Sequence, residues 1–183
     1  MGRPRTFDRE EVLEKAMKVF WRRGFADTGM HDLELATGVN KSGLYAEFKD
    51  KNDLFLSALK YYQSTRKARA LLSVEPLGWD NIERYLRHVE SATREGKGCF
   101  NVNTLRDLAL LPPEVREAVQ QNRAELKALF AQNVQTAIPG QDAAPLTEIV
   151  VTFFSGLCIE QSGDLPDAGD KVGAFMKVLR GLL

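Results

Sequence analysis

Side chains that can bind phosphate groups and base edges are concentrated between residues 41 and 51. Lys41, Ser42, Tyr45, Lys49 and Lys51 place ammonium and hydroxyl groups within this short stretch. Ammonium groups bind phosphate oxygens and guanine edges, and hydroxyl groups bind phosphate. The stretch is therefore a candidate nucleic-acid contact. The alternative is an ordinary solvated surface, where most charged side chains lie.

Two short helices with a tight turn between them are predicted to carry these side chains. The range 29–37 follows Thr28, an expected N-cap, and the range 41–48 follows Asn40, a second expected N-cap. Gly38 lies between them, where a residue that adopts positive φ at low cost closes a turn. This pattern predicts a helix-turn-helix, in which the second helix enters the major groove of DNA.

The second of these helices is expected to turn one face toward DNA. Leu44 and Phe48 lie four residues apart and are expected to face inward, which leaves Lys41 and Tyr45 outside. The free backbone amides at the start of a helix also bind phosphate oxygens.

The first predicted helix begins after Asp8, an expected N-cap, and ends at Gly24. A basic segment precedes it. Arg3 and Arg5 lie in this segment, and short arginine-bearing arms of this kind reach into the minor groove beside a bound helix. The whole chain has 25 basic and 25 acidic residues and a formal net charge of zero. Positive charge for a DNA contact must therefore be local, because the chain as a whole is not basic.

Apolar residues recur at helical spacing through the remaining chain, and no stretch of useful length alternates apolar and polar residues as a strand does. Proline and glycine separate the further predicted helices. One begins at about 51, with Asp50 as its expected N-cap, and the others cover about 79–93, 100–110, 114–137, 143–161 and 167–182. We expect an all-α fold of about nine helices. Residues 1–50 would form a three-helix DNA-binding domain and residues 51–183 a helical ligand-binding and dimerisation domain, linked by the helix from about 51.

Other classes of protein find little support. Cys99 and Cys158 are far apart and form no C-x-x-C pair, which argues against a zinc finger or a disulfide scaffold and fits a reducing cytoplasm. No apolar run reaches the ~18 residues that span a bilayer. We find no nucleophile elbow, phosphate loop or metal-ligand set. The sequence thus predicts a cytoplasmic protein that is not an enzyme and needs no cofactor, metal or membrane.

The pattern Gly-Val-x-Lys-x-x-Leu-Tyr-x-x-Phe-x-x-Lys occupies residues 38–51 and follows Gly24-Phe25 and Thr28. It resembles the DNA-binding domain of the TetR/AcrR family, and the resemblance covers roughly the first 60 residues. It implies a homodimer on double-stranded operator DNA and an inducer pocket in the C-terminal domain. The DNA contacts expected on this basis are Arg3, Arg5, Thr28, Lys41, Ser42, Gly43, Tyr45, Lys49 and Lys51.

Three residues depart from the family pattern. Glu34 stands where a small alanine is usual, and Gly43 stands where serine or threonine is common. Glu47 is expected on or near the exposed face of the second helix, where phosphates would repel it unless it accepts from a cytosine amino group. We therefore expect base recognition to depend on fewer side chains than the family pattern suggests.

The expected control of DNA binding has two forms. In the first, a small hydrophobic or electrophilic inducer releases a repressor from its operator. In the second, oxidation or electrophilic modification of Cys99 releases the repressor. A helix N-terminus favours the thiolate, and some family members with Gly-Cys at this point sense oxidants or electrophiles. The alternative for Cys99 is a small buried apolar residue. The candidate ligand-binding or sensing residues are Cys99, Phe100, Asn103 and Phe153.

The last two predicted helices are apolar enough to form a two-fold interface, as a dimer that binds two half-sites ~34–36 Å apart requires. The alternative is that they are internal core helices. The residues expected at the interface are Leu146, Ile149, Val150, Phe153, Leu157, Phe175 and Leu179.

Overall fold

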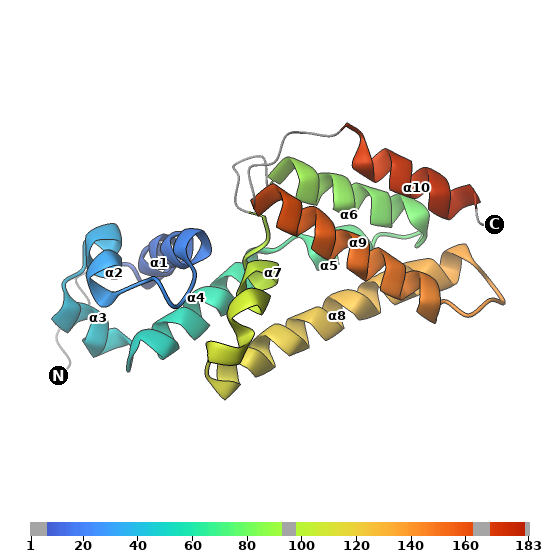
Figure 1. The fold of residues 1–183 in the computed structure, drawn as a ribbon. Helices are drawn as coiled ribbons and strands as arrows, with labels where there is room; N and C mark the ends of the chain where they lie inside the picture. Colours follow the sequence, from blue (N-terminus) through green and yellow to red (C-terminus); the bar gives the residue numbers. More distant parts are fainter. Residues whose placement is uncertain (1–6, 93–97, 163–168, 182–183) are drawn as a thin grey trace. The chain divides into compact units, whose positions relative to one another are not determined.

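The computed structural model describes residues 7–92, 98–162 and 169–181, and every regular element in these ranges is a helix (Figure 1). The predicted all-α fold is confirmed. None of the helices in these ranges is both long and apolar enough to cross a bilayer. In chain order the elements are α1 (Arg9–Arg23), α2 (Met30–Thr37), α3 (Lys41–Glu47), α4 (Lys51–Thr65), α5 (Ala68–Leu72), α6 (Trp79–Ala92), α7 (Phe100–Thr104), the 3-10 helix η1 (Leu105–Leu110), α8 (Pro113–Ala137), α9 (Ala144–Ser162) and α10 (Lys171–Gly181).

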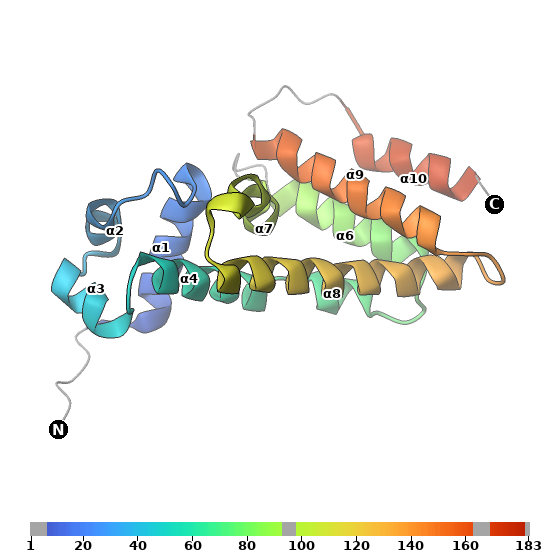
Figure 2. The same ribbon diagram turned by 60° about the horizontal axis from the view of Figure 1, so that its bottom comes forward.

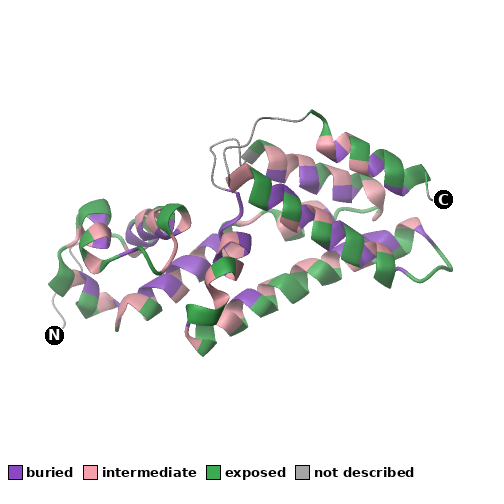
Figure 3. Cartoon of the chain, in the orientation of Figure 1, coloured by how far each residue is buried: buried purple, intermediate pink, exposed green. Residues whose placement is uncertain are grey.

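These helices form two compact units. The first unit comprises residues 1–65 and 103–120, and the second comprises residues 66–102 and 121–183. In the first unit α1 packs against α2 and α4 (Figure 2). In the second unit α6 packs against α5, α9 and α10. Figure 3 shows that buried residues recur between intermediate and exposed ones along the longer helices, such as α8 and α9, as expected for amphipathic helices.

Side-chain caps start three of the helices where the sequence predicts them. Asp8 accepts from the backbone N–H of Glu10 at 2.8 Å, and Asn40 accepts from that of Gly43 at 2.8 Å. Asp50 accepts from the N–H of Asp53 at 2.9 Å. Each cap satisfies an amide that has no partner inside its helix.

The predicted cap of α2 is wrong. Gly29, not Thr28, is the N-cap, and the carboxylate of Asp32 accepts from the Gly29 N–H at 2.8 Å. Thr28 is only 1% exposed, and its hydroxyl donates to the carbonyl of Gly24 at 2.6 Å. The Thr28 side chain closes the turn after α1 and is therefore not available to α2.

Two predicted boundaries are also corrected, and one helix is added. The helix expected over 100–110 changes to a 3-10 helix after Thr104, and the short α5 was not predicted. The last helix begins at Lys171 instead of 167, and residues 167 and 168 lie outside the described ranges.

Aromatic rings form the centre of the first unit. Phe20 and Phe55 meet edge to face with their centroids 4.8 Å apart, and Phe25 meets Phe55 in the same way at 5.1 Å. This geometry is favourable for ring quadrupoles. The cluster joins α1 and α4 to the turn that leads into α2.

In the second unit a buried amide holds the segment before α6. The Asn133 side-chain amide donates to the carbonyls of Leu72 at 2.7 Å and Leu129 at 2.9 Å. Its oxygen accepts from the backbone N–H of Gly78 at 2.9 Å and from the amide of Asn81 at 3.1 Å. Because these four bonds use the hydrogen-bonding capacity of the side chain, Asn133 can be buried at little cost.

Candidate functional site

The exposed face of α3 carries three of the predicted DNA contacts. Leu44 and Phe48 are buried, as predicted, and they pack α3 against its own unit. Lys41, Ser42 and Tyr45 are exposed, with 51% of Tyr45 accessible to solvent. The structure therefore brings these side chains together on one accessible helix face.

The N-terminus of α3 is held by two side chains. Asn40 Oδ1 accepts from the backbone N–H of Gly43 at 2.8 Å and from the hydroxyl of Ser42 at 2.9 Å. Glu34, from α2, accepts from the backbone N–H of Lys41 at 3.2 Å. The departure at Glu34 thus has a structural reason, because its carboxylate joins α2 to the first amide of α3.

Glu47 does not lie on the exposed face of α3, and the expectation that it would is wrong. Its carboxylate accepts from Arg9 Nε at 2.9 Å, and its side chain is only 13% exposed. The Arg9 guanidinium also lies over the ring of Phe48, 5.3 Å from the centroid. Glu47 therefore ties the end of α3 to the start of α1, and Arg9 compensates its charge.

Gly43 fits where a larger residue would crowd its neighbours. A Cβ atom at Gly43 would lie 2.8 Å from Val39 Cγ1 and 3.2 Å from Asn40 Oδ1. The first distance is below any ordinary contact, so Val39 would have to move. The departure at Gly43 thus lets the turn pack closely against α3.

Lys51 has a structural role that sequence analysis missed. Its ammonium donates to the carbonyls of Phe25 and Thr28, both at 3.0 Å, and lies 4.1 Å from the centroid of the Phe25 ring. Two charge-assisted hydrogen bonds and a cation–π contact therefore connect α4 to the turn before α2. These two bonds leave the third N–H of the ammonium for another acceptor.

The other predicted DNA contacts differ in their surroundings. Lys49 is exposed, and its backbone N–H donates to Asp53 at 3.0 Å. Thr28 is buried, as described above, so its side chain offers little surface to a phosphate. Arg3 and Arg5 lie outside the described residues.

Cys99 and Cys158 are close together although they are far apart in the sequence. Both are buried, and their thiols form a hydrogen bond. Arg66 donates to Cys99 Sγ at 3.0 Å and to the hydroxyl of Tyr85 at 2.7 Å. Burial raises the pKa of Tyr85 to about 12, so its hydroxyl stays protonated at neutral pH.

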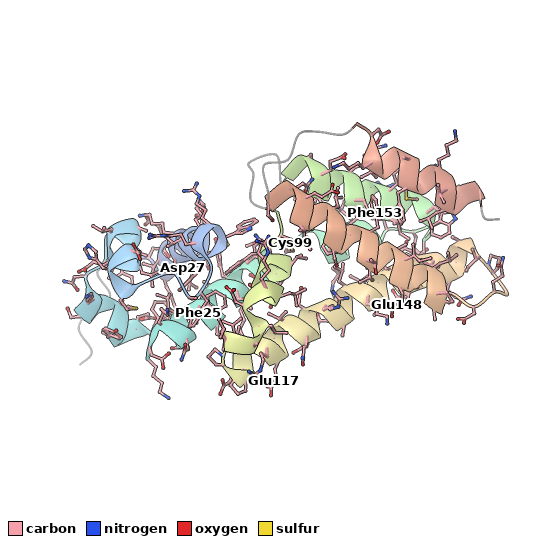
Figure 4. All side chains as sticks on the ribbon, in the orientation of Figure 1. Phe25, Asp27, Cys99, Glu117, Glu148 and Phe153 are labelled. Atoms are coloured by element: carbon pink, nitrogen blue, oxygen red, sulfur yellow. The ribbon has the colours of Figure 1, made fainter. Side chains whose placement is uncertain are left out.

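The four residues predicted to bind or sense a ligand are distributed over the fold. Cys99 and Phe100 are adjacent and buried at the start of α7, whereas Asn103 belongs to the first unit. Phe153 lies on α9 (Figure 4). Its ring stacks on that of Phe175 of α10, with ring centroids 3.8 Å apart.

The predicted interface residues fall into two groups. Val150, Leu157 and Leu179 are buried within the second unit, which corresponds to the core alternative for these three positions. Ile149 is 47% exposed, and Leu146, Phe153 and Phe175 are half-buried.

Ile159 and Val178 are also exposed on α9 and α10 but were not predicted. Ile149 and Phe153 lie four residues apart and therefore on one side of α9, which is the sequence signal for this outer face.

Two family models match this chain. Residues 12–58 match the model described as bacterial regulatory proteins of the tetR family, and residues 79–159 match a tetracyclin repressor-like C-terminal domain. The chain belongs to the TetR family. It is accordingly a DNA-binding transcriptional regulator and not an enzyme.

Similar proteins agree with this assignment over most of the chain. The transcriptional repressor ComR of Escherichia coli is 49% identical over 86% of this chain and 81% of its own length. The repressor BdcR of Escherichia coli is 26% identical over 85% of this chain and 80% of its own. The TetR family regulator CifR, solved as a cysteine-substituted mutant with a 26-bp operator duplex, has 28% identity and a TM-score of 0.80 over 98% of this chain and 97% of its own.

The two lysines beside the helix-turn-helix of this TetR-family chain should respond differently to substitution. We expect Lys51→Met to lower the free energy of unfolding by about 1–3 kcal/mol, because it removes a cation that two carbonyls share. Lys49→Met changes an exposed side chain, so its effect should stay within about 0.5 kcal/mol. Urea unfolding followed by circular dichroism measures both. Equal effects of the two substitutions would show that the Lys51 contacts contribute nothing.

Proposed function

We propose that this chain is a repressor that binds its operator as a homodimer and is released by a small hydrophobic or electrophilic inducer. In this proposal residues 1–50 bind DNA and residues 51–183 bind the ligand and dimerise. The observation that carries it is the exposed face of α3, with Lys41, Ser42 and Tyr45 outward and its inner side chains buried. The operator-bound structure of CifR and the repressors ComR and BdcR support it by similarity.

The contacts on α3 can be assigned by the hydrogen bonds that remain available. Lys41 and Tyr45 are exposed and can bind a guanine edge and a phosphate, respectively. Ser42 already donates to Asn40, so we assign its hydroxyl as an acceptor from a base amino group. Gly43 contributes close packing instead of a side-chain contact.

Residues around α3 supply phosphate contacts in this proposal. Lys49 offers a whole ammonium group, and Lys51 offers the N–H that the carbonyls of Phe25 and Thr28 do not use. Arg3 and Arg5 would enter the neighbouring minor groove. Each phosphate that a cation neutralises releases counterions and makes binding more sensitive to salt.

Salt titrations should identify the DNA-contacting face. We expect Lys41→Met to weaken binding to the DNA upstream of the gene for this protein and to lower the slope of log K against log salt by about 1. Lys60→Met, on the exposed side of α4, is the matched control and should leave the slope unchanged. Fluorescence anisotropy at several salt concentrations measures both. An unchanged slope for Lys41→Met would place α3 outside the groove.

The dimer in this proposal forms through the outer face of α9 and α10. Ile149 and Ile159 on α9, together with Val178 on α10, are large apolar residues left exposed within one chain. Phe153 and Phe175 stack between the two helices and add half-buried aromatic surface. A two-fold interface would cover this face with the same face of a second copy.

A charge on this face should separate the dimer. We expect Ile149→Glu to raise the dimer dissociation constant at least about tenfold, because the carboxylate would lose its water at the interface. Leu110→Glu is the control, since it makes the same chemical change at a position that is 70% exposed in the first unit. Sedimentation velocity over a range of protein concentrations gives the constants. Equal dissociation of the two variants would exclude the α9 face as the interface.

The second candidate function is a thiol-sensing repressor with Cys99 as the switch. The observation that favours it is the Arg66 guanidinium, which donates to Cys99 Sγ at 3.0 Å. A cation beside a cysteine stabilises its thiolate, the form that reacts with oxidants and electrophiles.

The variant Cys99→Ser tests both forms of control in the same DNA-binding assay. We expect hydrophobic inducers found by thermal-shift screening to release the variant and the wild type alike, since a reversible ligand needs no thiol. We expect an oxidant to release only the wild type. If no compound shifts melting or releases DNA, the inducer proposal is wrong. If the oxidant releases Cys99→Ser as it does the wild type, thiol sensing at Cys99 is wrong.

A further inference from the structure

In the second unit three buried side chains, those of Cys99, Cys158 and Tyr85, form a group with the half-buried Arg66. Cys99 and Cys158 share a hydrogen bond, and Arg66 bridges Cys99 Sγ and the Tyr85 hydroxyl. These are the only two cysteines in the sequence. Both are almost completely buried, whereas Arg66 is half-buried and connects Cys99 to the surface. The grouping therefore combines two thiols with a cationic donor that solvent reaches.

Gly98 brings the two thiols together. It adopts φ of +60°, and a Cβ atom there would lie 2.3 Å from the carbonyl oxygen of Cys158 and 2.1 Å from Ser162 Oγ. Only glycine fits such an approach without a shift of the α9 backbone. The segment before α7 thus passes directly against the backbone at Cys158. Close backbones are what a disulfide requires, because its two Cα atoms lie within about 7 Å of each other.

The surroundings give the two thiols different roles. The hydrogen bond to Cys99 and burial raise the pKa of Cys158 well above its ordinary value, so Cys158 keeps its proton at neutral pH. Arg66 instead places two donor groups toward Cys99 and Tyr85, and a guanidinium binds a thiolate more strongly than a thiol. Cys99 is therefore suited to attack, and Cys158 is suited to react second.

We propose that a hydroperoxide oxidises Cys99 and that Cys158 resolves the product into an intramolecular Cys99–Cys158 disulfide, with Arg66 stabilising the attacking thiolate. This proposal rests on the thiol-sensing candidate function and adds its reaction partner. It names a modification site of two residues, where the sequence alone suggests one cysteine.

The reaction is balanced with hydrogen peroxide as the oxidant. The Cys99 thiolate attacks one peroxide oxygen, the O–O bond breaks, and the leaving hydroxide takes a proton to become water. Cys99 is then a sulfenic acid. The Cys158 sulfur attacks the Cys99 sulfur, the S–O bond breaks, and the Cys158 proton leaves with the hydroxide as a second water. Two thiols are oxidised and one peroxide is reduced.

Thiol counting and peptide mapping test the bond itself. After hydrogen peroxide treatment of the full chain, we expect free thiols measured under denaturing conditions to fall from two to none and dithiothreitol to restore both. Mass spectrometry without reductant should show a peptide pair joined through Cys99 and Cys158. Sulfenic or sulfinic acid without that pair, or a disulfide between two chains, would overturn the proposal.

Three variants test the assigned roles. Cys158→Ser should accumulate a Cys99 sulfenic acid that dimedone traps, whereas the wild type should give little adduct.

Arg66→Met should slow thiol loss, because it lowers the fraction of Cys99 that is thiolate. Each tenfold drop in that fraction should slow the reaction only about threefold, since the more basic thiolate that remains is also more nucleophilic. Arg69→Met changes an exposed arginine three residues further on and should react at the wild-type rate. Circular dichroism and operator binding in reductant show that each variant is folded. Equal rates for Arg66→Met and Arg69→Met would remove Arg66 from the mechanism.

Operator binding separates this inference from the function on which it rests. A mapped Cys99–Cys158 disulfide with unchanged operator affinity supports the modification site and contradicts thiol sensing. Release of the wild type and of Cys158→Ser at the same peroxide dose, with no mapped disulfide, supports sensing by Cys99 and overturns the pairing.

Discussion

The ammonium of Lys51 is the contact on which the geometry of the helix-turn-helix depends. It binds the carbonyls of Phe25 and Thr28 and lies against the Phe25 ring, whose other neighbours are Phe20 and Phe55 of the aromatic core. The turn before α2 is thereby attached to the start of α4 as well as to the end of α1. Because hydrogen bonds to a charged group are about twice as strong as neutral ones, one side chain can fix this turn. The position of α2, and through it that of α3, follows from this attachment.

Ion pairs within the first unit decide which charges remain for DNA. Arg9 is bound to Glu47, and Arg23 is bound to Asp32. The backbone N–H of Gly29 and then Arg23 hold the pKa of Asp32 below its ordinary value, so the carboxylate stays charged and keeps α1 joined to α2. Lys41 and Lys49 remain exposed beside α3. A chain with no net charge can present a locally basic surface where lysines are exposed and the nearby carboxylates of Glu47 and Asp32 are already paired with arginines.

The second unit uses buried polar groups in two different ways. The side-chain amide of Asn133 makes all of its hydrogen bonds, to four neighbours, and thereby fixes the segment before α6. Arg66 instead donates to the thiol of Cys99 and the hydroxyl of Tyr85. The bonds of Asn133 are complete as they stand, whereas the hydrogen bond from Arg66 to Cys99 becomes stronger when Cys99 is an anion. Asn133 therefore has a structural role, whereas Arg66 can stabilise the anionic form of a neighbouring thiol.

The sequence by itself determined the features whose causes are local. The caps at Asp8, Asn40 and Asp50 act on amides two or three residues away, and Leu44 and Phe48 face inward because four residues complete about one helical turn. Only the tertiary structure decided the roles of Glu47, Lys51 and Cys158. Their partners lie 38 residues away for Glu47, 26 for Lys51 and far along the chain for Cys158. No local pattern encodes such partners, because the packing of other helices brings them together.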